Sequence, residues 1–78
     1  MQGGHLRRLY FNRKIQRLPY ECIYGCDNLR SVVFASGTKL KSGSSAIADC
    51  EHLAVIVGTK SYIFRWMAEK AGATLITL

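Results

Sequence analysis

Apolar residues recur along the chain at intervals of 22 to 24 residues. The repeat is clearest at four leucines: Leu6, Leu29, Leu53 and Leu75. Three positions after each leucine lies another apolar residue: Leu9, Val32, Ile56 and Leu78. A further position repeats as Phe11 and Phe34 and weakens at Gly58. Several positions that repeat together indicate a true internal repeat, and a repeat of this length determines the architecture of a chain.

A helix is predicted over residues 62–71, between the third and fourth of these leucines. Apolar residues recur there at steps of three and four: Ile63, Phe64, Met67, Ala68 and Ala71. Ser61 precedes the segment as a suitable N-cap, and Gly72 follows it as a suitable end. Trp66 lies beside the apolar side of the helix. Its side chain is interpreted either as partly buried against the preceding coil or as an exposed anchor for a partner.

The repeat resembles the BspA-type leucine-rich repeat. The core pattern L-x-x-L-x-L in units of 22 to 24 residues has the length and spacing of leucine-rich repeats. The segments IQRLPYECIYGCDNLRSVVF and SSAIADCEHLAVIV match the units of that family in their Cys, Leu and Ile positions. The tail SYIFRWMAEKAGATLITL is similar to the segment that closes such arrays. The resemblance covers about residue 6 to the end of the chain.

This resemblance implies an α/β repeat fold, namely a short leucine-rich-repeat solenoid with a small parallel sheet of about four strands and a C-terminal helix. We expect a disordered tail at residues 1–5 and a single domain at 6–78, with units near 6–28, 29–52 and 53–78. The leucines and their partners would point into the core. With 78 residues, the chain is near the lower limit for one self-standing domain.

The resemblance also implies a function as a noncatalytic protein-binding or adhesion module. Repeat folds of this kind bind partners on the concave face of the sheet. The residues expected on that face alternate with the inward ones: Arg8, Tyr10, Ser31, Val33, Val55, Val57 and Thr77. Several are apolar, which indicates either a protein-contact strip or simply the preference of valine for strands.

Positive charge is concentrated near the N-terminus. The chain has a net charge of +6, and no acid occurs before Glu21. Five basic residues precede it: Arg7, Arg8, Arg13, Lys14 and Arg17. They predict either a solvated surface or an electrostatic binding site for nucleic acid or a sulfated polysaccharide. Nucleic acid is the less favoured ligand, because no nucleic-acid-binding motif accompanies the charge.

Catalysis and cofactors find little support in the sequence. Cys22, Cys26 and Cys50 are an odd number of cysteines, and the repeat directs Cys26 and Cys50 inward as structural thiols, with a disulfide left open. The spacing C-x₃-C with a distant His52 does not have the form of a zinc site. We therefore expect no enzyme activity, no metal and no cofactor.

Location and completeness stay open at this level. No signal peptide is visible and no apolar run is long enough to span a membrane, whereas the resemblance implies a secreted or cell-surface protein. The first unit begins in the middle of the pattern. The chain is therefore interpreted either as the C-terminal portion of a longer array or as a short protein that associates with itself through its first strand.

Overall fold

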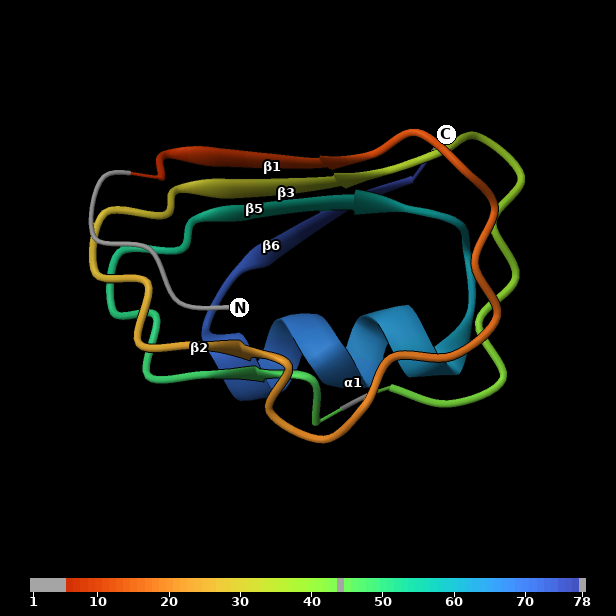
Figure 1. The fold of residues 1–78 in the computed structure, drawn as a ribbon. Coiled ribbons are helices and arrows are strands. Elements are labelled where there is room, and N and C mark those ends of the chain that lie inside the picture. The colour runs from red at the N-terminus through yellow and green to blue at the C-terminus, as the bar shows by residue number, and fades with distance from the viewer. Residues whose placement is uncertain (1–5, 44, 78) are drawn as a thin grey trace.

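The computed structural model describes residues 6–43 and 45–77, and the tail expected at residues 1–5 lies outside this range. Its main element is a parallel four-stranded sheet (Figure 1). The strands, in their order across the sheet, are β1 (Arg8–Phe11), β3 (Ser31–Phe34), β5 (Val55–Gly58) and β6 (Thr74–Thr77). Each strand therefore pairs with the next one contributed along the chain, as the repeat predicts.

A second layer covers one side of this sheet. It contains two short parallel strands and a helix: β2 (Ile23–Tyr24), β4 (Ile47–Ala48) and α1 (Tyr62–Ala71). The chain passes from a sheet strand to this layer and back three times, and the three passages, residues 8–30, 31–54 and 55–77, are called the first, second and third coil below. Figure 1 shows the second layer below the sheet, and the core lies between the two. The molecule is thus a small α/β domain with one helix.

Phenylalanine rings connect the three coils within the core. Phe11 stacks on Phe34 with ring centroids 4.8 Å apart, and Phe34 meets Phe64 edge to face at 4.9 Å. Phe64 comes from α1 and takes the place of a phenylalanine at Gly58, where the sequence pattern weakens. A Cβ atom added at Gly58 would lie 2.6 Å from Phe64 Cδ1. The glycine is therefore part of the same aromatic packing.

Helix α1 has the bounds that the sequence predicts. The hydroxyl of Ser61 accepts a hydrogen bond from the Phe64 N–H at 3.4 Å, and Gly72 ends the helix in the left-handed conformation with φ of 70°. The apolar side, including Ile63 and Met67, is buried. Within the described residues no helix has the length and apolar character needed to cross a membrane.

The register of the last strand differs from the prediction. Leu75 was expected to align with Leu53, but it pairs with Ile56. After α1 and its left-handed end at Gly72, the chain enters the sheet three residues earlier than predicted, so that Leu75 takes the position expected for Leu78. A hydrogen bond from the Thr74 N–H to the Ala54 carbonyl, at 2.8 Å, holds this register. Because side chains alternate between the two faces of a strand, a register shift by an odd number of residues changes which residues of β6 face outward. Leu78, the predicted inward partner, lies outside the described residues.

Candidate functional site

The outer side of the four-stranded sheet, opposite the core, carries two rows of side chains in register across all four strands. The first, called the apolar row, consists of Tyr10, Val33, Val57 and Ile76. The second, called the mixed row, consists of Arg8, Ser31, Val55 and Thr74. Because adjacent strands lie about 4.8 Å apart, each row extends across roughly 14 Å. Six of the seven residues predicted for this face are therefore brought together.

The ends of the apolar row are more exposed than its centre. Tyr10 is 59% exposed and Ile76 is 47% exposed, while Val33 and Val57 are half-buried between their neighbours. In Figure 1 the second layer lies on the other side of the sheet. The apolar row is thus an accessible strip with large side chains at both ends, which can contact a flat or extended surface.

Thr77, the seventh residue predicted for this face, lies outside both rows. Thr77 pairs with Gly58, one position beyond Ile76, so strand alternation directs it to the opposite side from Ile76, and its side chain is exposed. The outward positions of β6 are Thr74 and Ile76, which the sequence analysis did not assign to this face. Alternation within TLIT could have identified them, but only after the register of β6 was known.

The predicted basic patch divides into two parts. Arg8 lies in the mixed row, and the carbonyl of Arg7 accepts a hydrogen bond from the Arg30 N–H at 2.8 Å, so both residues are at the start of the sheet strands. Arg13, Lys14 and Arg17 follow the end of β1. A strand of four residues separates the two parts, which corresponds to about 13 Å of chain.

The second coil adds two lysines to the latter part. Lys14 and Lys39 line the same hollow of about 200 Å³. The Lys41 N–H donates to the Gln16 carbonyl at 2.7 Å. The resulting set, called the basic ridge, consists of Arg13, Lys14, Arg17, Lys39 and Lys41. Sequence analysis missed the two lysines of the second coil.

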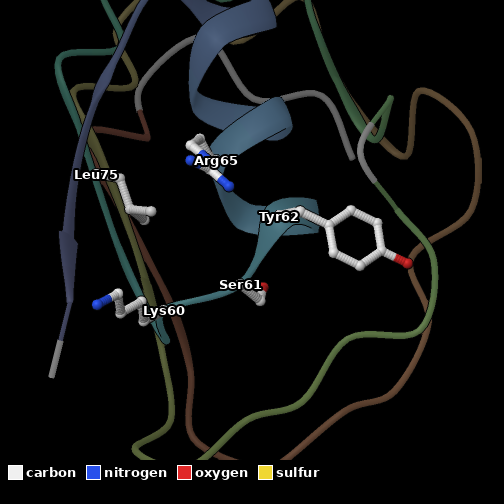
Figure 2. A pocket seen from close by; sticks show the side chains of 5 residues that line it. All are labelled: Lys60, Ser61, Tyr62, Arg65 and Leu75. Carbon is white, nitrogen blue, oxygen red and sulfur yellow. The ribbon is translucent and has the colours of Figure 1, made fainter.

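A larger groove, of about 450 Å³, lies at the start of α1 (Figure 2). It is lined by Lys60, Ser61, Tyr62, Arg65 and Leu75. Figure 2 shows Lys60 and Leu75 on one side and the Tyr62 ring directed away from them. The Ser61 hydroxyl already caps α1 by accepting a hydrogen bond from the Phe64 N–H. The lining includes no carboxylate or imidazole that could act as a general base beside it.

Cys26 and Cys50 occupy the inward positions that the repeat predicts. Cys26 and Cys50 are buried, Cys22 is half-buried, and none of the three is in a disulfide. The Cys50 thiol donates to the Ala48 carbonyl at 3.4 Å, and burial raises its pKa above the ordinary value. A raised pKa keeps the thiol protonated and weakly nucleophilic near neutral pH. The described part of the chain contains no group of three or more metal-ligating side chains.

Two exposed aromatic residues lie on α1, away from the sheet. Trp66 is 51% exposed and meets Tyr62, itself 57% exposed, edge to face with ring centroids 5.1 Å apart. Of the two interpretations left open for Trp66, the structure favours an exposed ring. The pair forms a small aromatic surface separate from the apolar row, and it provides a comparison surface for binding experiments.

Comparison of the chain with protein-family models, with curated proteins and with solved structures found no match in any of the three.

Proposed function

We propose that this protein is a noncatalytic protein-binding module that uses the outer side of its four-stranded sheet. The observation that carries the proposal is the apolar row, in which four nonpolar or aromatic side chains stand in register across the sheet. When one face of a sheet is not covered by another layer, the residues that point toward that face are normally polar. A continuous apolar strip on such a face is typical of an interaction surface.

The composition of the strip suits a protein partner. Tyr10 provides a rigid aromatic ring with a polar end, a side chain that is enriched at protein interfaces. Arg8 lies on the same strand in the mixed row, where it can form an ion pair at the rim of a contact. The favoured partner is therefore a protein surface with apolar residues at its centre and acidic residues at its margin.

The leucine-rich-repeat interpretation belongs to the same proposal. It is supported by the recurring leucines and by the addition of one parallel strand per repeat. The equivalent burial of Cys26 and Cys50 in consecutive coils supports it as well. Within the BspA-type family that the chain resembles, this architecture implies adhesion, at the cell surface or in secreted form, to proteins of a host or of its extracellular matrix.

Binding to a panel of immobilised extracellular-matrix proteins tests this function. We expect the wild-type chain to bind a member of the panel with only a weak dependence on salt between 0.05 and 0.5 M, because salt screens the rim contact of Arg8 but not the apolar contacts. The double variant Tyr10→Ser/Ile76→Thr should lose roughly tenfold or more in affinity, since truncating a well-packed aromatic anchor costs about 2 kcal/mol.

The matched control is Tyr62→Ser/Trp66→Ser, which removes exposed apolar side chains from α1 and leaves the sheet unchanged. It should bind like the wild type. Loss of binding in this control, with binding retained by Tyr10→Ser/Ile76→Thr, would assign the contact to α1 instead of the sheet. No binding to any protein of the panel would contradict the adhesion function.

A further inference from the structure

Charge is segregated between the two ends of the sheet strands. The chain contains five acids, and none occurs in residues 12–20 or 35–48. These two segments begin where β1 and β3 end and lead to the second layer, on the right of Figure 1. Three of the five acids, Asp27, Asp49 and Glu51, lie instead in the segments that lead back into β3 and β5. One end of the molecule is thus cationic with no acid in its connecting segments.

The basic ridge is held together by backbone contacts between the first two coils. Besides the hydrogen bond from Lys41 N–H to the Gln16 carbonyl, Arg17 forms a parallel bridge with Ser42. The end of the Lys14 side chain lies over Gly37, where an added Cβ would be 3.2 Å from both Cε and Nζ. These contacts define the backbone positions of the ridge in both coils.

All five side chains of the ridge are exposed, and they form two rows that follow neighbouring coils. Neighbouring paired segments lie about 4.8 Å apart, and the charges of a row extend over two residues (Lys39 to Lys41) or four (Arg13 to Arg17), roughly 7–13 Å of extended chain. Charges spaced in this way cannot all contact one small anion. It matches a linear polymer that carries several anionic groups along its length, for which contacts add through the release of counterions.

We propose that the basic ridge binds a sulfated polysaccharide. Single-stranded nucleic acid is bound by basic grooves that also offer aromatic rings for base stacking, and neither residues 12–19 nor residues 35–43 include an aromatic residue. Tyr20 follows directly, but its hydroxyl is hydrogen-bonded to the Glu21 side chain, and that carboxylate raises the pKa of Tyr20. The acid places negative charge beside this exposed ring, and the other flanking rings, Phe11 and Phe34, stack on each other in the core. The ridge also presents no helix that could enter a duplex groove.

This surface is distinct from the apolar row, so the proposal is independent of the proposed function. Arg8 is the only basic residue of the predicted patch that lies on the outer side of the sheet. A protein partner on the sheet and a polysaccharide on the ridge would contact different side chains. Both could therefore bind at the same time.

Titration with a heparin dodecasaccharide at several salt concentrations tests the proposal. Five contacts predict that log Kd rises with log salt at a slope of about 4, if the scale of 0.7–0.9 per contact for nucleic acids also applies to a sulfated chain. The variant Lys39→Gln/Lys41→Gln should reduce the slope to about 2.5 and weaken binding roughly 20-fold at 0.15 M salt. Both lysines are exposed, so the fold should be retained in circular dichroism spectra.

The matched control is Arg7→Gln/Arg30→Gln, which removes the same net charge at the other end of the strands. A much smaller loss in this control supports the ridge, whereas equal losses in the two variants would overturn it in favour of diffuse attraction to net charge. A single-stranded oligonucleotide of equal charge should bind more weakly than the dodecasaccharide. Tighter binding of the oligonucleotide, or equal binding of a desulfated polysaccharide, would also overturn the proposal.

Discussion

At the scale of single residues, the clearest constraint lies where the repeat pattern is weakest. Gly58 occupies the position of Phe11 and Phe34 in the third coil, and Phe64 fills the space from α1 instead. Gly58 is not in the left-handed region, so backbone freedom does not explain the glycine. The reason is steric, because the buried ring of Phe64 leaves no space for a Cβ atom.

We therefore expect Gly58→Ala to destabilise the protein by about 1–3 kcal/mol, the usual cost of overpacking a core. The cost should fall when Phe64 is first shortened to leucine, since the added methyl group then has space. Urea denaturation of the wild type, both single variants and the double variant measures this coupling. An unchanged cost of Gly58→Ala in the Phe64→Leu background would contradict the steric explanation.

At the scale of elements, α1 could be predicted from the sequence and the register of β6 could not. The bounds of α1 follow from local signals, namely apolar spacing, Ser61 as N-cap and Gly72 as the end. The register of β6 depends on how the chain returns from α1 to the sheet, which no local pattern encodes. Leu75 could align with Leu53 or with Ile56 equally well by residue type, and packing of the helix selects Ile56.

The same distinction explains why the basic ridge was only partly predicted. In the sheet, Phe11 pairs with Phe34, so paired residues of the first two coils are 23 positions apart in the sequence. In the segments that follow the strands, Arg17 pairs with Ser42, and the separation is 25 positions. The second coil is thus two residues longer in its crossing segment than the first. A fixed repeat length cannot reveal that Lys39 lies beside Lys14. By contrast, six residues of the outer sheet face were predicted because strands keep a strict alternation.

The end of α1 allows a separate test of backbone strain. Gly72 has φ of 70°, and an added Cβ would meet nothing within 4 Å. Gly72→Ala should therefore cost about 1 kcal/mol through the left-handed conformation alone. Gly72→Asn should cost less, because asparagine tolerates this region. Thermal and urea unfolding measure both values, and equal costs for the two variants would indicate a steric contact instead of a conformational penalty.

At the scale of the whole molecule, the first coil forms one end of the stack within the described residues 6–43 and 45–77. β1 is an edge strand, and the apolar residues around it are only half-buried: Leu6, Leu9, Phe11 and Ile15. Their counterparts in the second coil are buried: Leu29, Val32, Phe34 and Leu40. An unpaired strand edge beside apolar side chains is a template for pairing with another chain. The net charge of +6 opposes such pairing between two copies.

These two effects predict self-association that depends on salt. Screening is weak at 0.02 M salt and strong at 0.5 M, since the Debye length falls from roughly 20 Å to about 4 Å. We expect light scattering behind a sizing column to find monomers at low salt and a dimer at high salt. Leu6→Lys, which places a charge beside the edge strand β1, should prevent the dimer, whereas Ile76→Lys on the outer side of the sheet should not. If Ile76→Lys alone abolished the dimer, the copies would meet through the apolar row, and monomers at both salt concentrations would show that the edge of β1 does not pair.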